Sequence, residues 1–249
     1  PSWVPEDLKK QGLVDVHGAT DRGRVYRLAP AGFKVPKPPR LAKISTVALV
    51  PYLEHANAWF RETAQRLLVE RQDRTAVEPL RQMVSESQLM FGRLHAMWTL
   101  AGLDGLRDED LLRSVTDQSA LVREHAALLV EPRLAAAGPW SAQRKQLLTA
   151  VLKLASDESP RVRFQVALTL GEIQHPDTIA ALAHIIQRDL ADPWMRTAAL
   201  SSVTRVADQL LVRLLARRLV VDDLAGQAVL KELALMSGGE RTTEELDRV

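Results

Sequence analysis

The sequence of 249 residues contains no cysteine. It therefore cannot carry a disulfide framework, a zinc–thiolate or iron–sulfur site, a cysteine nucleophile or a C-x-x-C-H haem attachment of its own. Aromatic residues make up only 4% of the chain. No apolar run approaches the roughly 20 residues that span a bilayer. These absences exclude several classes of redox and metal protein and a membrane-spanning segment within this chain.

Motifs of catalysis are missing as well. The sequence has no G-x-S-x-G, no Gly-rich phosphate loop and no H-E-x-x-H, which are the spacings that assemble a nucleophile, a phosphate cradle or a metal pair. The acidic pairs around Asp108 and Asp222 are interpreted as helix starts, where negative charge complements the helix dipole. We therefore predict no catalytic, cofactor-binding or metal-binding residue and no enzyme activity for this segment.

Positive charge is concentrated at one end of the chain. The net charge is +2, but residues 1–43 hold nine Lys and Arg against four Asp and Glu, while the remainder holds 24 against 27. The main body thus lacks the positive balance that nucleic-acid binding requires. Nucleic acid is not predicted as a partner.

The first 43 residues differ in composition from the rest. Residues 1–39 hold six of the 13 prolines and four of the 12 glycines, which oppose long helices. Two short alternating apolar runs, 12–17 and 23–28, predict a strand pair joined by a turn. We expect residues 1–29 to be the end of a β-domain and residues 30–43 to be a stiff, Pro-rich linker.

From about residue 44 the apolar residues recur with helical spacing, and no segment resembles a strand. The helical domain is expected to cover residues 44–236, followed by a tail at 237–249. The clearest predicted helices are Ala58–Arg71, Gln88–Gly102, Leu121–Glu131, Ser141–Ala155, Val162–Ile173, Thr178–Arg188 and Trp194–Val206.

These helices contain an internal repeat built around an arginine. An apolar residue usually lies one or two places before the arginine, and a small or apolar residue lies three places after it. The repeated arginines are Arg61, Arg93, Arg123, Arg163 and Arg196. The pattern resembles HEAT-type repeats, most clearly from Asp157 to Gly171. Because a single helix pair cannot bury its apolar face alone, stacked pairs form one continuous core. The sequence predicts an all-α, HEAT-like α-solenoid (an armadillo-type superhelix) of five to six helix pairs.

Loop aspartates accompany several of these arginines. Asp117 and Asp157 precede theirs by six residues, and Asp192 precedes its own by four. A guanidinium offers five donors in a rigid fork, which suits bonds to a loop carboxylate or to backbone carbonyls. We therefore interpret these residues as structural repeat positions. The alternative is a ladder of positive charge that binds an anionic partner.

Histidine and tryptophan supply the remaining candidates. His95 and His125 occupy the same repeat position, so a shared metal or haem contact is the alternative to a packing role. Trp59, Trp98 and Trp194 fall at helical core spacing and are expected to be buried. Trp3 and Trp140 are the candidates for docking a neighbouring domain, where aromatic residues contribute strongly.

Specific segments add a resemblance to a known family. Residues 57–71, 93–103 and 122–126, together with strand-like residues 14–17 and 21–28, resemble the helical region and propeller end of membrane-bound dehydrogenases of planctomycete type. That family combines a β-propeller, HEAT-like repeats and a c-type cytochrome domain. The resemblance covers most of residues 12–135.

The resemblance implies a non-catalytic spacer that docks neighbouring redox domains or a protein partner in an extracytoplasmic protein. Haem c would belong to a neighbouring domain, and no position here matches a catalytic or haem-ligating residue. Two alternatives stay open: a free-standing HEAT-repeat adaptor for a protein partner, and a haem-binding module that uses His95 and His125.

Overall fold

The computed structural model describes residues 6–11, 30–34 and 39–239, and the chain divides into two units, Pro1–Pro39 and Arg40–Val249. The first unit includes the short helix α1 (Glu6–Lys10). Both predicted strands and Trp3 lie outside the described residues. The second unit begins before the predicted start at residue 44, because Leu41 in the 3-10 helix η1 (Leu41–Lys43) is already buried in its core.

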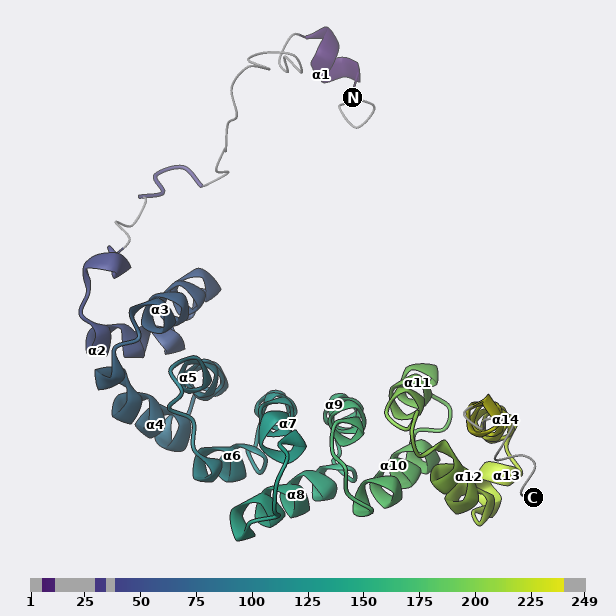
Figure 1. Ribbon diagram of the computed structural model, residues 1–249. Helices are drawn as coiled ribbons and strands as arrows, with labels where there is room; N and C mark the ends of the chain where they lie inside the picture. Colours follow the sequence, from purple (N-terminus) through teal and green to yellow (C-terminus); the bar gives the residue numbers. More distant parts are fainter. Residues whose placement is uncertain (1–5, 12–29, 35–38, 240–249) are drawn as a thin grey trace. The chain divides into compact units, whose positions relative to one another are not determined.

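The second unit consists of helix pairs arranged in two rows (Figure 1). The first-helix row contains α2 (Thr46–Leu49), α4 (Val77–Glu86), α6 (Asp108–Ser114), α8 (Ala142–Leu154), α10 (Asp177–Arg188) and α12 (Ala207–Leu215). The second-helix row contains α3 (Ala58–Arg71), α5 (Met90–Gly102), α7 (Ala120–Ala135), α9 (Pro160–Gly171), α11 (Pro193–Ser201) and α14 (Leu224–Gly239). Shorter elements connect them: η2 (Val50–Glu54), η3 (Arg74–Ala76) and α13 (Arg218–Val221).

Packing follows the order of the chain in both rows. In the second-helix row, α3 contacts α5, α5 contacts α7, α7 contacts α9, α9 contacts α11, and α11 contacts α14. In the first-helix row, the contacts run from α4 through α6, α8 and α10 to α12. The described part of the chain contains helices and no strand. The predicted all-α solenoid is confirmed.

One apolar core runs through the whole helical unit, from Leu41 to Leu233. The position three residues after each repeat arginine is fully buried in every repeat. Its occupants are Ala64, Ala96, Ala126, Val166 and Ala199. Four of the five are alanines, whose small side chains suit a closely packed position. The core is therefore shared between repeats, as a solenoid requires.

Two of the three tryptophans expected in the core are exposed, so that prediction is wrong for them. The side chain of Trp59 is 56% exposed and that of Trp194 is 74% exposed, whereas Trp98 is half-buried. Trp59 and Trp194 each lie two residues before a repeat arginine, which places them roughly 200° around the helix from it. The arginine points into the row, so the tryptophan points away from it.

Two helix ends also differ from the prediction. The structure continues α7 through Pro132 to Ala135, whereas the sequence predicts an end at Glu131. It ends α11 at Ser201, before the predicted end at Val206. Along the described residues, no helix combines the length and the apolar character needed to cross a membrane.

Gly171, the last residue of α9, lies directly against the end of α11. A Cβ atom on this residue would lie 2.7 Å from the Cβ and 2.8 Å from the Cα of Ser202. Because one of these atoms belongs to the backbone, the two helices would have to move apart. Glycine at this position therefore sets how closely consecutive repeats stack.

We expect Gly171→Ala to lower the free energy of unfolding by about 1–3 kcal/mol, as overpacking of a close contact does. Urea unfolding followed by circular dichroism measures the change. Gly238→Ala is the matched control, because a Cβ there meets nothing within 4 Å. Equal stability of the two variants would show that α9 and α11 do not approach this closely.

Candidate functional site

The repeat arginines share one place in the structure. Each is the fourth residue of its second-row helix, in α3, α5, α7, α9 and α11. In every case Nη1 donates to the backbone carbonyl six residues earlier, in the loop that precedes the helix. Helical side chains lean toward the helix N-terminus, which brings the guanidinium to that loop. The arginine thus holds its own loop in a fixed conformation.

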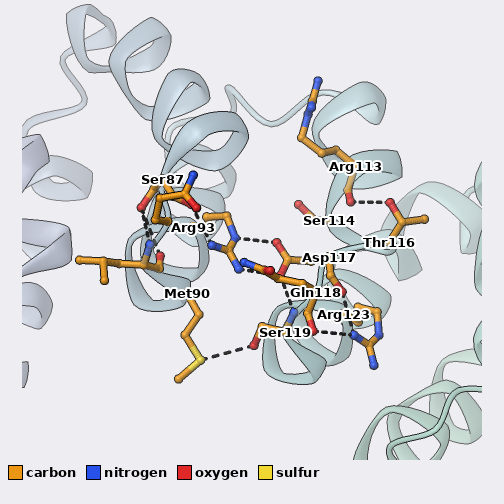
Figure 2. A network of polar contacts seen from close by, with 12 residues as sticks. Ser87, Met90, Arg93, Arg113, Ser114, Thr116, Asp117, Gln118, Ser119 and Arg123 are labelled. Atoms are coloured by element: carbon orange, nitrogen blue, oxygen red, sulfur yellow. Dashed lines mark hydrogen bonds and ion pairs between the residues drawn. The ribbon is translucent and has the colours of Figure 1, made fainter.

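Three of the arginines also reach into the next repeat. Arg93 donates from Nε to Oδ2 of Asp117 at 2.6 Å and from Nη2 to Oδ1 at 2.7 Å. Arg123 makes the same pair of bonds to Asp157, at 2.7 and 2.8 Å. Such two-pronged pairs fix both distance and orientation. Figure 2 shows Asp117 between the two arginines: its carboxylate faces Arg93 and its carbonyl accepts from Arg123.

The partner of Arg163 is an aspartate that the sequence did not single out. Arg163 binds Asp189 through both Nε, at 2.7 Å, and Nη2. Asp192, which the sequence groups with the loop aspartates as a structural repeat position, caps α11 by accepting from the backbone N–H groups of Trp194 and Met195. The reason is the loop, in which Asp189 precedes Arg196 by seven residues instead of six. A sequence search at fixed spacing therefore passes over it.

Arg61 and Arg196 have no carboxylate partner among the described residues. Arg61 donates to the carbonyls of His55 and Ala56 and lies 3.4 Å from Nε2 of His95. Its guanidinium stacks on the ring of Phe91 at 4.3 Å. Arg196 bonds to the carbonyl of Leu190. The Arg–Asp ladder, which we define as Arg93–Asp117, Arg123–Asp157 and Arg163–Asp189, therefore belongs to the interior repeats.

The ladder shifts the pKa values of Asp157, Arg123 and Arg163. Burial raises the pKa of the Asp157 carboxyl, but hydrogen bonds from Arg123 and from the Ser159 N–H outweigh it and hold the pKa below its usual value. The hydrogen bond to Asp157 likewise raises the pKa of Arg123, and the bond to Asp189 raises that of Arg163. For Arg123, Asp157 and Arg163, the direction of each pKa shift favours the ionised form.

Burial argues against the ladder as a surface for anions. The side chains of Arg61, Arg93 and Arg163 belong to residues that are only 8%, 6% and 5% exposed. Their donors are directed at carbonyls and carboxylates of the same chain. An external anion would have to displace these bonds, so the geometry favours the structural interpretation.

His95 and His125 each contact the preceding helix of the row. In His95, Nε2 faces Arg61 and Nδ1 lies 2.7 Å from Oε1 of Gln65, so both ring nitrogens are occupied. In His125, Nδ1 accepts from Nε1 of Trp98 at 3.1 Å. Among the described residues, no group of three His, Asp or Glu side chains is placed to hold a metal ion. The contacts favour packing roles for both histidines.

Trp140, a predicted docking residue, is half-buried within the chain itself. The Arg144 guanidinium lies 4.1 Å from the centre of its ring, and His175 meets it edge-on at 5.0 Å. This tryptophan therefore joins the start of α8 to the loop before α10.

A different set of side chains lies open at the start of the second-row helices. We call it the edge row: the residues two places before each repeat arginine. It consists of Trp59, Phe91, Leu121, Arg161 and Trp194. Phe91 is 40% exposed, in addition to the two exposed tryptophans, and the neighbouring Leu89 is 54% exposed. The periodic spacing marked these positions, but it did not show that they face away from the core.

Comparison with known proteins agrees with the repeat pattern. A family profile of HEAT repeats matches residues 132–204 and 148–237. No curated protein matches the chain. Similar solved structures include an engineered protein (18% identity, TM-score 0.40, covering 78% of this chain and 97% of that one). They also include a designed armadillo repeat protein in complex with the peptide (KR)4 (15% identity, TM-score 0.43, covering 78% of this chain and 99% of that one). The helical unit contains a HEAT-like repeat region.

We expect Arg163→Ala to lower the free energy of unfolding by about 3–5 kcal/mol, because it leaves a partly buried Asp189 without its partner. Thermal unfolding measured by circular dichroism tests this. Arg161→Ala is the matched control: Arg161 pairs with Glu124 at the surface, and its loss should cost less than about 1 kcal/mol. Equally small losses in the two variants would refute the structural role of the ladder.

A second prediction concerns pH. Burial, reinforced by the charge of Arg61, lowers the pKa of His95 below 6.5. The unfolded chain therefore binds this proton more readily than the folded chain, so the contribution of His95 is present above pH 6.5 and is lost as the pH falls below it. We therefore expect the free energy of unfolding of His95→Gln, taken relative to wild type, to rise when the pH is lowered from about 7.5 to about 5.5. Urea midpoints at the two pH values measure the gain; an unchanged difference would contradict it.

Proposed function

We propose that this chain is a non-catalytic HEAT-like scaffold that binds other protein surfaces along its edge row. The observation that carries the proposal is the exposure of Trp59 and Trp194 at equivalent positions of separate repeats. Exposed tryptophans supply much of the binding energy at protein interfaces. Because the second-row helices pack in sequence, their first turns line one edge of the unit, and one partner can contact several of them.

The division of labour within the repeat supports this proposal. The side chains of the Arg–Asp ladder are engaged in hydrogen bonds within the chain, whereas the side chains of the edge row make few contacts of this kind. Arg161 differs from its neighbours in this row, because its ion pair with Glu124 at 3.1 Å replaces an apolar side chain by a polar one. The row is therefore apolar toward both ends of the unit and charged at α9, which would orient a partner along it.

More finely, we propose that the scaffold is the spacer of a larger, extracytoplasmic dehydrogenase with a c-type cytochrome domain. Support comes from the resemblance of residues 12–135 to that family and from the strand-like leader that would end a β-propeller. In this proposal haem c belongs to a neighbouring domain. The partners are the propeller and cytochrome domains, and the edge row is where they dock.

The decisive experiment is to read the coding sequence on both sides of this segment. We expect a propeller-type sequence upstream and a C-x-x-C-H motif downstream. A reading frame that holds only this chain would contradict the spacer proposal and favour the free-standing adaptor.

In the full protein, we expect Trp59 and Trp194 to be oxidised several-fold less by hydroxyl radicals than in the isolated chain, because docked domains would cover them. Mass spectrometry of the tryptic peptides measures this protection. Trp140 is the internal control, since Arg144 and His175 already cover it within the chain. Equal oxidation in the two forms would exclude the edge row as the docking surface.

A further inference from the structure

A cleft of about 960 Å³ lies at the opposite ends of the second-row helices, away from the edge row. It is bounded by the C-terminal parts of α7, α9 and α11 and by the loops that lead to α10 and α12. Gly171 forms part of its wall, where close contact with Ser202 brings two repeats together. The cleft is therefore a product of the stacking and not of a single repeat.

One carboxylate is held in a fixed position at the α7 side of the cleft. Both Thr169, at 2.7 Å, and Gln165, at 3.2 Å, donate to Oε1 of Glu131. Oε2 of Glu131 receives no hydrogen bond from the described residues. It is also not fully buried, so it can be reached from outside. Because Glu131 lines the cleft, this second oxygen is left for a donor that enters from outside.

Among the described residues, neither Glu131 nor Glu172 forms an ion pair with a cationic side chain. Glu172 lies on the same cleft and repels Glu131; together with burial, which is the larger cause, it raises the pKa of the Glu131 carboxyl. The cleft also contains His175 and Arg205. His175 is turned toward Trp140 and Asp177, and Arg205 lies in the loop between α11 and α12 and forms no ion pair within 4 Å of either carboxylate. A positive group between Glu131 and Glu172 would relieve the repulsion.

Leucines form part of a mixed polar and apolar wall around these carboxylates. Leu128 lies one helical turn before Glu131 on α7, and Leu168 lies one turn before Glu172, the residue that follows α9. Leu168 is 36% exposed, so its side chain can contact a bound group. Lys and Arg side chains combine a long aliphatic stem with a charged end. The stem fits the leucines and the charged end fits the carboxylates.

We propose that this cleft binds a lysine or arginine side chain presented by an extended segment of a partner protein. The charged end donates to Oε2 of Glu131 and lies beside Glu172, while the stem packs on Leu128 and Leu168. This inference rests on the proposed function as a protein-binding scaffold, and it adds a second surface with its own chemistry. The partner is recognised by charge at one point and by apolar contact around it.

The test uses the full chain and two fluorescein-labelled peptides. One peptide alternates leucine with arginine, and the other has citrulline, the uncharged analogue, in place of each arginine. Fluorescence anisotropy measures the two dissociation constants. We expect the arginine peptide to bind at least about tenfold more tightly, the effect of one charge-assisted hydrogen bond. Equal binding of the two peptides, or binding of neither, overturns the proposal.

Three variants locate the site. Glu131→Gln should weaken binding of the arginine peptide by about tenfold. Leu168→Ser, which changes no charge and no buried side chain, should weaken both peptides several-fold. Glu62→Gln is the matched control, because Glu62 is exposed on α3, outside the cleft, and its substitution changes the net charge equally. Thermal unfolding confirms that each variant is folded.

Equal effects of Glu131→Gln and Glu62→Gln would show that the peptide senses only overall charge and would overturn the cleft. The proposed function is tested by a different measurement, so it can fail independently of the cleft. Protection of Trp59 and Trp194 in the full protein depends on the edge row, so it would persist if the cleft bound nothing.

Discussion

The helical unit depends on the two-pronged bond between an arginine of one repeat and an aspartate of the next. Asp117 illustrates why: its carboxylate holds Arg93, its carbonyl accepts from Arg123, and its Oδ1 accepts from the Ser119 N–H. One residue therefore fixes a loop, the helix that follows it and the helix before it. Apolar burial supplies most of the stability of such a stack, but it is not directional. The hydrogen bonds of the Arg–Asp ladder are directional and therefore fix how neighbouring repeats are oriented.

Much of this arrangement could be predicted from the sequence. The period of the arginines and the small residues three places later indicated the repeat, and helix α3 runs from Ala58 to Arg71 as predicted. The predictions were weaker where a position is decided by its neighbours in space. Asp189 was missed because its loop is one residue longer, and Trp59 and Trp194 were wrongly assigned to the core because helical spacing alone does not say which face is buried.

The cleft could not have been found in the sequence at all. Glu131, Thr169 and Glu172 come from two helices, and nothing in their spacing distinguishes them from the many other carboxylates and hydroxyls on solvated helix faces. They meet because α7 and α9 pack side by side in the second-helix row. Local pattern thus identifies the repeat, whereas the surfaces that differ between repeats arise only from their stacking.

Among the described residues, Arg61 and Arg196 have no carboxylate partner, and this has a mechanical consequence. If the chain is pulled at its ends, the Arg–Asp pairs resist separation of the repeats that contain α5, α7, α9 and α11, whereas no such pair joins the repeats on either side of them in the described part of the chain. We therefore expect the stack to be stiffest from α5 to α11 and more compliant on either side of that stretch. Under that expectation, a domain attached on one side can reorient without passing strain to a domain on the other.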